Sequence, residues 1–496
     1  MNLSKSLYCK AIQCNKMLWL EKNHPEEKGE IDNESVLDNG TEVGEYAKNL
    51  FGPHTDIEFS KDLSKMIEDT KQALTNQNIT ITEASFNYNN NFCSVDILKK
   101  INNNYELYEV KSSTEVKDIY IYDASYQYYV MTKLGYNVTK VSIVHIDSSY
   151  IRGKNLELDK LFKIIDITDI AKSNLNKTEE KIEEINTYMN QTQDPTDDIG
   201  IHCTTPYQCP YFEYCTKNLP KPNIFNIRRM SSKQKFKYYH EGIYSYEDLL
   251  NTTINWKYKQ QVEFTLHNYQ PLINKQKIKE FLNTITYPLY FLDFETYQQS
   301  IPKYTGISPY QQIPFQYSLH YIEKEKGELL HKEFLSEPDI DPRRALAEKL
   351  VEDIPKNVCT IAYNMMFEKM VIKKLAKDFP DLSNHLMNIH DNMKDLMIPF
   401  YQRDYYTKDM EGSYSIKYVL PSLFPNDPSL NYHNLEGVHN GSEAMATYAN
   451  LGTFTKEEQQ KIRHNLLKYC ELDTYAMVKI WEKLNEVVKE SEENDN

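Results

Sequence analysis

Apolar runs and helical spacing mark the elements of the C-terminal half of the chain. Tyr287–Phe294 is almost continuously apolar, which predicts a buried strand. Residues 360–368 begin with an apolar run and continue into a different pattern, which predicts a second strand followed by the start of a helix. Residues 466–474 place apolar side chains at helical spacing. This succession of strands and helices predicts an α/β domain.

The N-terminal half shows the pattern of a β-hairpin. Strand-like residues 92–98 and 105–111 flank a short polar turn at 102–104, and such a turn between two strand-like runs predicts a hairpin. Residues 123–131 have a helical pattern, and a charged helical stretch follows at Lys177–Met189. Strands and helices therefore alternate here too, so we expect an α/β fold in both halves.

The length of the chain predicts more than one domain. At 496 residues it exceeds the size at which a single hydrophobic core keeps growing, so two or three domains are expected. The patterns predict four segments: a first domain over 1–220, a basic helical connector over 221–285, a second domain over 286–485 and a disordered polar tail over 486–496.

The connector is basic in an otherwise acidic chain. Between Lys221 and Glu280 there are eleven Lys and Arg against five Asp and Glu, a net charge of +6. Aromatic residues lie among these charges: Phe236, Tyr238, Tyr239, Trp256 and Tyr258. Two interpretations stay open. The connector is either a surface that follows a nucleic-acid backbone and stacks on its bases, or a solvated helical linker.

The overall charge and the lack of long apolar segments restrict the class of protein. A net charge of −15 argues against sequence-independent coating of nucleic acid, which needs clustered Lys and Arg. No N-terminal segment has the pattern of a signal peptide, and the longest apolar runs are too short to span a bilayer. We therefore expect a cytoplasmic protein without a membrane partner. In such a protein, clustered cysteines indicate metal binding more than disulfides.

Five side chains of the C-terminal half form a candidate metal site. Asp293 and Glu295 are two residues apart on the predicted strand, so both point to one face. Adjacent acids repel each other unless a cation lies between them, and Mg²⁺ or Mn²⁺ prefers such oxygens. Glu368, at the predicted helix start, can join them. Tyr469 and Asp473 are four residues apart and share one helix face.

These motifs resemble those of the DEDDy branch of the DnaQ-like exonucleases, which have an RNase H-like fold. The order is Asp-x-Glu, then Asn-x-x-Phe followed by an acid, then Tyr-x-x-x-Asp, over roughly Tyr287–Leu484. The resemblance implies two-metal hydrolysis of a phosphodiester from a 3′ end. It implies the following roles: ions held by Asp293, Glu295, Glu368 and Asp473, water oriented by Tyr469, and a seat for the substrate strand shaped by Asn364 and Phe367.

Two acids near this motif need separate comment. Glu368 stands where the resembling enzymes usually have Asp, and its extra methylene can still reach a metal ion but alters the geometry of the second metal site. Asp395, in Lys394-Asp-Leu-Met, opens a predicted helix. We expect it to be a cap or a first-turn acid.

The predicted hairpin of the first domain presents Asp96, Glu109 and Lys111. Glu109 and Lys111 project to the same face of their strand. A metal ion held by Asp96 and Glu109 can then act beside a cation that stabilises the attacking water or the phosphate. Gln127, on the following helix, can contact the same site. This is the logic of the PD-(D/E)xK nucleases, so the first domain is expected to be restriction-endonuclease-like.

Four cysteines offer a separate metal centre in the first domain. Cys14 lies near the N-terminus, and Cys203, Cys209 and Cys215 lie at the other end of the domain. Four thiolates suffice for an iron–sulfur cluster or a structural zinc ion, and either would join the two ends of the domain. Cys9 is an alternative to Cys14. The cysteines that lie within apolar runs are expected to be buried: Cys93, Cys359 and Cys470.

Together these N-terminal features resemble the RecB-like nucleases with an iron–sulfur staple, including the CRISPR-associated RecB-like exonucleases. The resemblance implies a [4Fe–4S] cluster on the four cysteines, with zinc as the alternative. The first two late cysteines are separated by five residues, where two is more usual. Gly44 stands where such enzymes often place a metal-binding His. Three interpretations stay open. The site holds one metal ion fewer, or Glu42 or Glu45 replaces the His as a metal ligand, or the domain binds DNA without cutting it.

The order of modules resembles a bacterial family that fuses a RecB-like domain to a DnaQ-like domain, and the late motif Gly412–Pro421 also fits it. The resemblance implies a metal-dependent nuclease: a 3′–5′ DNA exonuclease with a second RecB-like nuclease or DNA-binding module, in DNA repair or defence. The expected partner is nucleic acid, with DNA favoured over RNA. The alternatives are an RNA exonuclease and a nucleic-acid-binding scaffold whose catalytic sites have decayed.

Overall fold

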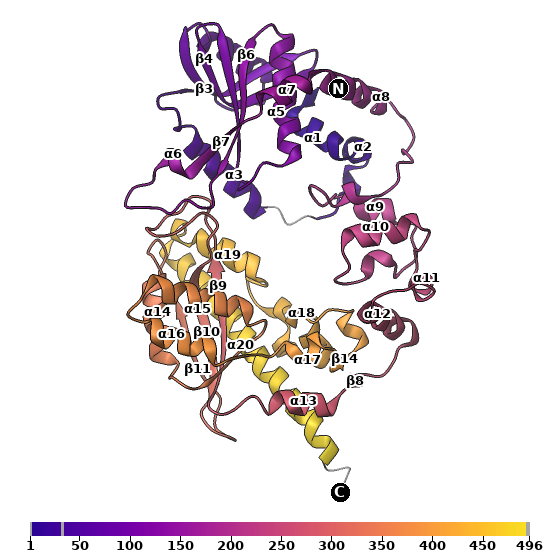
Figure 1. Cartoon of the computed structure of the whole chain (residues 1–496), viewed down its shortest axis with the longest axis vertical. Coiled ribbons are helices and arrows are strands. Elements are labelled where there is room, and N and C mark those ends of the chain that lie inside the picture. Colours follow the sequence, from indigo (N-terminus) through magenta and orange to yellow (C-terminus); the bar gives the residue numbers. More distant parts are fainter. Residues whose placement is uncertain (1, 31–33, 493–496) are drawn as a thin grey trace. The chain divides into compact units, whose positions relative to one another are not determined.

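The protein is a mixed α/β molecule with two compact units, as a computed structural model of residues 2–30 and 34–492 describes (Figure 1). Unit 1 comprises Met1–Leu219 and Gln299–Gln311, and unit 2 comprises Pro220–Gln298 and Gln312–Asn496. The predicted α/β, multidomain class is therefore confirmed at this level. Among the described helices, none combines the length and apolar character that a bilayer-spanning segment needs.

Unit 1 is built on one sheet in the order β2-β3-β4-β5-β6-β7, with β1 paired to β4. The strands are β1 Leu3–Ser4, β2 Thr55–Asp56, β3 Asn78–Tyr88, β4 Asn91–Ile101, β5 Asn104–Lys111, β6 Asn137–Ile146 and β7 Phe162–Asp166. The predicted hairpin is confirmed, because β4 and β5 pair antiparallel. The next connection runs through a helix, since β5 and β6 pair parallel.

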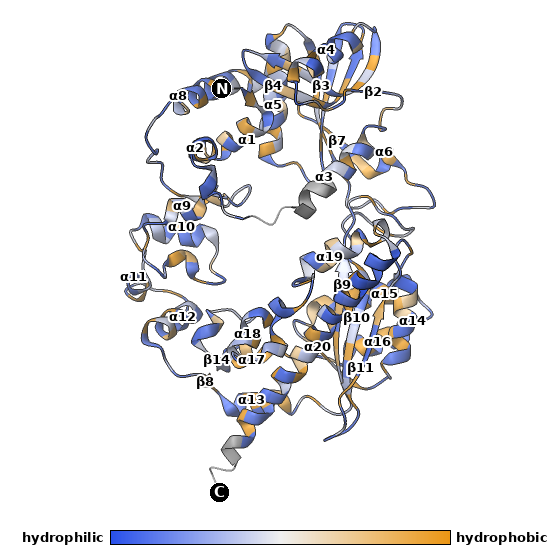
Figure 2. Cartoon of the chain, turned by 180° about the vertical axis from the view of Figure 1, so that it is seen from behind, coloured by the Kyte–Doolittle hydropathy of each residue, from blue (hydrophilic) through white to orange (hydrophobic). Residues whose placement is uncertain are grey.

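Helices lie on both faces of this sheet (Figure 1). Their bounds are α1 Lys5–Gln13, α2 Asn15–Asn23, α3 Glu34–Ala47, α4 Leu63–Ala73, α5 Asp118–Lys133, α6 Leu158–Leu161, α7 Thr168–Ser173, α8 Leu175–Tyr188 and α9 Phe212–Thr216. The predicted helix at 177–189 is α8, which is largely hydrophilic (Figure 2) and buries only a few side chains.

Strand alternation decides which side chains of the hairpin face the long helix α5. Ile97 of β4 and Tyr108 of β5 pack with Val43 and Ala47 of α3 in one hydrophobic core. Because successive side chains of a strand point to opposite faces, the neighbours of these two residues point to the other face. Helix α5 packs on the sheet together with α1, and the polar constellation of unit 1 lies there.

Unit 2 is built on a sheet in the order β11-β10-β9-β12-β13. The strands are β9 Leu289–Tyr297, β10 Ile313–Ile322, β11 Leu330–Leu335, β12 Cys359–Ala362 and β13 Met393–Asp395, with a separate pair of β8 Leu272–Ile273 and β14 Tyr405–Tyr406. The predicted strands at 287–294 and 360–362 are β9 and β12. Strand β9 is central, antiparallel to β10 and parallel to β12.

Two hydrophobic cores cover the two faces of this sheet. Tyr290 and Leu292 of β9 pack against α14, α15 and α16, whereas Leu289 and Phe291 pack against α13, α18 and the long helix α20. The helices of unit 2 are α10 Ser232–His240, α11 Tyr246–Leu250, α12 Trp256–His267, α13 Lys275–Leu282, α14 Arg343–Asp353, α15 Met366–Asp378, α16 Ser383–Asp391, α17 Ile398–Tyr401, α18 Ile416–Leu423, α19 Gly441–Ala449 and α20 Lys456–Glu492.

The segment predicted as a connector is a packed part of unit 2. It is helical as expected, but residues such as Ile227 and Leu249 form a small core of their own, and Phe264 and Ile278 belong to the core beneath α20. Most of its aromatic residues therefore serve packing. Among them Trp256 is 56% exposed, and the interpretation of this segment as a surface that follows nucleic acid stays a prediction.

Two predicted borders differ from the structure. The predicted tail at 486–496 is helical as far as Glu492, because α20 continues and buries Val487 and Val488 in the core; residues 493–496 lie outside the described part. Residues 299–311, predicted as part of the second domain, belong to unit 1. There Ile301 joins the core of Val43 and Ala47, a packing that no local pattern could reveal.

Candidate functional site

The central strand of unit 2 carries the first two acids of the candidate site. Leu289 and Phe291 face α20, and side chains two residues apart share a face, so Asp293 and Glu295 point to α20 as well. Helix α20 supplies Asp473 opposite them. Ligand oxygens of Asp293, Glu295 and Asp473 all lie within 4.8 Å of one another. The structure thus brings together three of the four predicted carboxylates.

The fourth predicted acid, Glu368, lies in the first turn of α15. The chain turns from β12 into this helix at Asn364, whose φ is 67°. Glu368 is only 3% exposed, and its Oε2 has no hydrogen-bond partner. It is close enough to raise the pKa of Asp293 and of Glu295. A buried carboxylate oxygen without a donor is costly, and a metal ion would satisfy it.

The remaining predicted residues near Glu368 have structural contacts. Asp395 is the last residue of β13 and accepts hydrogen bonds from the backbone N–H of Asn364 at 3.0 Å and of Met397 at 2.9 Å. The N-cap of the following helix α17 is Met397, so the expectation of a helix cap or first-turn acid at Asp395 is wrong. Phe367 packs against the core beneath α14, α15 and α16. The seat for a substrate strand that we assigned to Asn364 and Phe367 stays a prediction.

The electrostatics of this site are unfavourable without a cation. Burial, reinforced by the neighbouring acids, raises the pKa of Asp293 and of Glu295 well above their ordinary values. Burial also raises the pKa of Glu368 to about 8 and that of Asp473 to about 6. Within the described residues, no Lys or Arg forms an ion pair with any of the four. Lys417 lowers the pKa of Glu295 and of Asp473, but the pKa of each stays above its ordinary value.

Two tyrosines hold Asp473. Tyr432 donates a hydrogen bond from its hydroxyl to Asp473 Oδ1 at 2.6 Å, and Tyr469 also hydrogen bonds to Asp473. Their rings lie 5.9 Å apart. Tyr469 was predicted from its spacing on the helix, but Tyr432 was missed because a loop far from the motif delivers it. The buried Cys470 adds a thiol 3.8 Å from Asp293 Oδ2.

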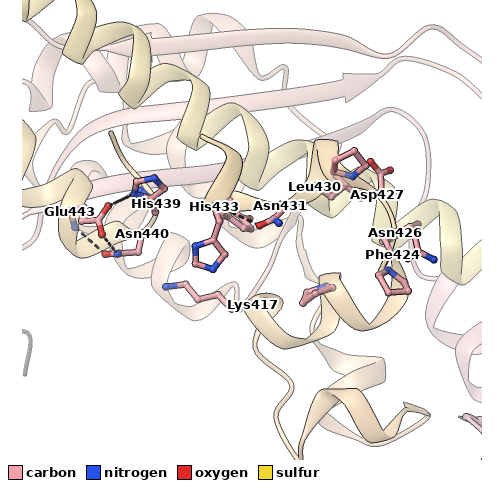
Figure 3. A pocket seen from close by; sticks show the side chains of 14 residues that line it. Lys417, Phe424, Asn426, Asp427, Leu430, Asn431, His433, His439, Asn440 and Glu443 are labelled. Atoms are coloured by element: carbon pink, nitrogen blue, oxygen red, sulfur yellow. Dashed lines mark hydrogen bonds and ion pairs between the residues drawn. The ribbon is translucent and has the colours of Figure 1, made fainter. Parts of the chain in front are cut away.

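A pocket of about 920 Å³ adjoins these carboxylates. Figure 3 shows its lining, which includes Lys417, His433, His439, Asn440 and Glu443. Tyr432 lines the pocket and bonds Asp473. The backbone beside the pocket residue Asn440 also lies close to the acids, because a Cβ atom added to Gly441 would be 3.8 Å from Glu295 Oε2. Of these residues only Lys417 fell within a motif noted in the sequence, Gly412–Pro421.

The residues of the unit 2 site fit one or two divalent ions. Oxygen donors converge from β9 and α20, Glu368 of α15 is close enough to repel them, and one buried oxygen of Glu368 lacks a hydrogen-bond partner. Hard cations such as Mg²⁺ and Mn²⁺ bind carboxylate oxygens of this kind. Asp293, Glu295, Glu368 and Asp473 would hold the ions.

The raised pKa values predict a pH dependence of stability. Folded unit 2 keeps protons on Glu368 up to about pH 8 and on Asp473 up to about pH 6, whereas the unfolded chain releases them near pH 4 to 5. The folded state binds more protons in this window, so the free energy of unfolding falls as pH rises from about 5 to 8. Mn²⁺ should abolish this decline, because it replaces the protons.

Thermal unfolding of the full chain at pH 6 and pH 8, in EDTA and in Mn²⁺, measures this effect. Hydrogen exchange of β9 and α20 reports on unit 2 in particular. Glu368→Gln should flatten the decline in EDTA, since it removes the group whose pKa is raised to about 8. An equal decline with and without Mn²⁺ would speak against metal binding at these acids.

The predicted residues of unit 1 meet at Glu109. Lys111 Nζ lies 2.6 Å from Glu109 Oε1, and Gln127 Nε2 donates to Glu109 Oε2 at 2.6 Å. Asp96 Oδ2 accepts from the backbone N–H of Val110 at 2.7 Å. Glu109 is 1% exposed, because α5 packs over it. Asp96, Glu109, Lys111 and Gln127 are therefore assembled as predicted, although their catalytic roles stay predictions.

Two side chains that sequence reasoning missed complete this network. Lys5 Nζ lies 3.1 Å from Asp96 Oδ1 and 3.1 and 3.2 Å from the two oxygens of Glu109. Asp123 accepts from Lys111 at 2.7 Å and from Gln127 at 2.9 Å. Asp123 lies one helical turn before Gln127, a spacing that was a usable signal. Lys5 lies in the opening segment Leu3–Tyr8, which resembles that of the RecB-like nucleases, but the sequence did not assign it to the site because the pairing of β1 with β4 brings it there.

The residues of this network do not fit a divalent ion between Asp96 and Glu109. The ammonium of Lys5 already lies in that space. Burial lowers the pKa of Lys5, but the two acids outweigh it and raise this pKa above the ordinary value. Every carboxylate oxygen of Asp96, Glu109 and Asp123 accepts from a protein group. We therefore assign no catalytic step to this centre.

The suggested substitutes for a missing metal-binding His have other partners. Glu42 accepts a hydrogen bond from Ser300 at 3.2 Å, and Glu45 forms an ion pair with Lys48 at 2.8 Å. Among the described contacts of α3, neither acid bonds to the groups around Glu109. Gly44 itself has open space around it.

A pocket of about 540 Å³ opens beside Lys111 in unit 1. Its lining combines cationic, aromatic and hydroxyl groups, among them Lys111, Lys117, Tyr120, Tyr207 and Tyr310. Lys117 Nζ lies 6.0 Å from the ring centre of Tyr120 and 5.8 Å from that of Tyr207. Such a lining suits a phosphate next to a planar base.

The four predicted cysteines line one small cavity of unit 1: Cys14, Cys203, Cys209 and Cys215. Gln13, next to Cys14, donates to the carbonyl oxygens of His202 at 2.8 Å and Tyr207 at 2.7 Å, which ties the N-terminal segment to the late cysteines. Cys9 does not line this cavity, and its thiol approaches the carbonyl of Ile119. Cys93, Cys359 and Cys470 are buried, as expected.

The donor chemistry of this cavity fits a thiolate-bound metal centre. Burial raises the pKa of Cys203 to about 11 and that of Cys209 to about 12, so the thiols need a cation to lose their protons. No three of the four sulfurs lie within 4.8 Å of one another, as far as the described residues show.

Comparison with known proteins gives a family model and two relatives. The model described as "Domain of unknown function (DUF2779)" matches residues 290–415, which contain Glu368 but end before Tyr469. An uncharacterized protein of Ureaplasma parvum is 25% identical over 268 residues, 49% of this chain and 38% of that protein. An uncharacterized protein of Mycoplasma genitalium is 27% identical over 235 residues, 44% of this chain and 35% of that protein. The chain thus spans well under half the length of these curated relatives.

Proposed function

We propose that unit 2 is a divalent-metal-dependent phosphodiester hydrolase of the DEDDy exonuclease kind, which removes nucleotides from the 3′ end of nucleic acid, with DNA the favoured substrate. The observation that carries this proposal is the convergence of Asp293, Glu295 and Asp473, all buried or half-buried, with the buried Glu368 close enough to raise the pKa of the first two and no ion-paired cation among the described residues. Such a cluster is unstable by itself and suits a site that takes up metal ions.

Each residue of the site has a defined task in this proposal. Two bound divalent ions would activate the attacking water and stabilise charge on the leaving oxygen. Asp293, Glu295, Glu368 and Asp473 orient the ions. Tyr469, held against Asp473, positions the water, and the pocket at Lys417 receives the terminal nucleotide. Lys417 faces the same acids and can neutralise part of the phosphate charge.

We propose separate, supporting roles for unit 1. Its pocket at Lys111 and Lys117 holds a stretch of nucleic acid, and the four cysteines carry a structural [4Fe–4S] cluster. The resemblance of the cysteine pattern to that of the iron–sulfur RecB-like nucleases favours a cluster over zinc. The biological setting we propose is DNA repair or defence.

Hydrolysis of end-labelled single strands tests the proposed activity. The full chain is incubated with 3′-labelled and 5′-labelled DNA and RNA oligonucleotides in Mg²⁺, Mn²⁺ or EDTA. We expect labelled mononucleotide from the 3′-labelled DNA in either metal and none in EDTA. Faster cleavage of RNA would change the substrate class. Binding of both strands without any cleavage would instead indicate a scaffold.

Tyr469→Phe separates the proposed role of the tyrosine from simple support of Asp473. Removing a group that positions the attacking water should lower kcat by about 10²-fold with little change in metal affinity. Tyr432→Phe is the matched control, because it deletes the other hydroxyl that bonds Asp473. Equal losses in both variants would show that the tyrosines only hold the carboxylate.

A further inference from the structure

The two acidic centres of the protein are neutralised in opposite ways. In unit 2, four acids approach one another without an ion-paired cation in the described part of that unit. In unit 1, the ammoniums of Lys5 and Lys111 lie among Asp96, Glu109 and Asp123. The first arrangement calls for cations from solution, and the second is already supplied with them.

We infer that Lys5 is the resident cation of the unit 1 centre: its ammonium replaces a divalent ion between Asp96 and Glu109, so that unit 1 takes up no such ion. Lys5 Nζ bridges the two acids at 3.1 to 3.2 Å. A metal ion bound at about 2.0–2.2 Å from the same oxygens would overlap the ammonium. Lys5 and a divalent ion therefore exclude each other.

The backbone fixes Lys5 in this position. Residues Leu3 and Ser4 form β1, which pairs with β4 beside Asn91 and Phe92. Ser4 caps α1 by accepting from the N–H of Leu7 at 3.3 Å. Tyr126 of α5 donates to the carbonyl of Leu3 at 2.7 Å. The first residue of α1 is thus anchored on both sides, and its side chain reaches over the strand to Asp96.

The remaining donors close the network around this ammonium. Lys111 bonds Glu109 and Asp123, and Gln127 bonds the same two acids from α5. Displacing Lys5 by a metal ion would put a doubly charged ion in place of a singly charged ammonium beside Lys111 and would leave the ammonium of Lys5 without its partners. The metal dependence of the whole chain should therefore reside in unit 2, and unit 1 should bind its ligand without a divalent ion.

Mn²⁺ titration of the full chain tests this inference. The background variant Asp293→Ala with Asp473→Ala removes metal binding by unit 2, whatever the activity of that unit. We expect it to bind no Mn²⁺ that depends on Asp96 or Glu109, by calorimetry and by electron paramagnetic resonance. Adding Lys5→Met should create one Mn²⁺ site, and Glu109→Gln should then remove it.

Stability provides a second readout of the same exchange. In EDTA, Lys5→Met should lower the melting temperature of unit 1, because it leaves the buried Glu109 and the partly exposed Asp96 without their shared cation, and Mn²⁺ should restore it. Lys5→Gln serves alongside in case the apolar side chain impairs folding. Lys10→Met is the control: Lys10 lies on the same helix and pairs with Glu21 at 2.6 Å, so Mn²⁺ should not affect it.

Two results would overturn the inference. One is an Mn²⁺ ion in the background variant that Asp96→Asn or Glu109→Gln removes while Lys5 is intact. The other is a folded Lys5→Met and Lys5→Gln pair that gains no Mn²⁺ site and no stabilisation by Mn²⁺. Neither result depends on whether unit 2 hydrolyses a phosphodiester.

Discussion

Asp293→Asn should abolish metal-dependent hydrolysis and at the same time stabilise unit 2 in EDTA. The variant keeps the shape of the side chain but removes one of four mutually repelling charges. Losing a central metal ligand costs several kcal/mol of transition-state stabilisation, which corresponds to a rate about 10³-fold lower. Relief of the burial cost and of the repulsion that together raise the pKa of Asp293 should increase the melting temperature by about 2–4 °C, equivalent to about 1 kcal/mol.

The opposite signs of these two effects make the test informative. A purely structural acid would lose stability when it is replaced, whereas a metal ligand kept at a cost gains stability and loses activity. Hydrolysis of 3′-labelled DNA in Mn²⁺ and thermal unfolding in EDTA measure the two quantities. Asp409→Asn, at an exposed position of unit 2, is the control. Unchanged hydrolysis by Asp293→Asn would refute the assignment of the site.

Cys209→Ala should remove the metal centre of unit 1 and much of the stability of that unit. A centre that binds Cys14 and the late cysteines closes a loop from residue 14 to residue 203. For a loop of that length the chain-entropy estimate is on the order of 5 kcal/mol, and this value is model-dependent. The hydrogen bonds that Gln13 donates to His202 and Tyr207 join the same two segments, so they should retain part of this stability.

Anaerobic purification, visible absorption and elemental analysis follow this change. We expect a brown wild-type protein, and a colourless Cys209→Ala variant whose unit 1 unfolds at lower temperature while hydrolysis by unit 2 persists. Cys9→Ala is the matched control, because Cys9 lies on α1, close in sequence to Cys14, but outside the cavity. Stoichiometric zinc in a colourless wild-type protein would show that the metal centre is a zinc ion and not a cluster. Metal-free protein with four reactive thiols would refute both.

Side chains whose position follows from local periodicity could be predicted from the sequence. Asp293 and Glu295 share a face because a strand alternates, and Tyr469 and Asp473 share a face because a helix repeats every 3.6 residues. Glu109 and Lys111 follow the same rule on β5. Such pairs need only the right type of element, and β9, α20 and β5 are the elements expected.

Residues that reach a site through tertiary packing could not be predicted. Lys5 arrives by the pairing of β1 with β4, and Tyr432 arrives on a loop that packs beside α20. Residues 299–311 belong to unit 1 because Ile301 is buried in a core that distant segments of the chain form. Val487 and Val488 show the same limit, because a polar sequence around them concealed the helix that they anchor.

The location of bound Mn²⁺ in crystals of the full chain most directly tests the proposal that unit 2 carries the metal-dependent chemistry. Anomalous scattering from crystals soaked in Mn²⁺ identifies each ion and its ligands. We predict ions at Asp293, Glu295 and Asp473, with Glu368 drawn into the site, and none between Asp96 and Glu109. Ions at Asp96 and Glu109, with the unit 2 carboxylates unoccupied, would contradict it.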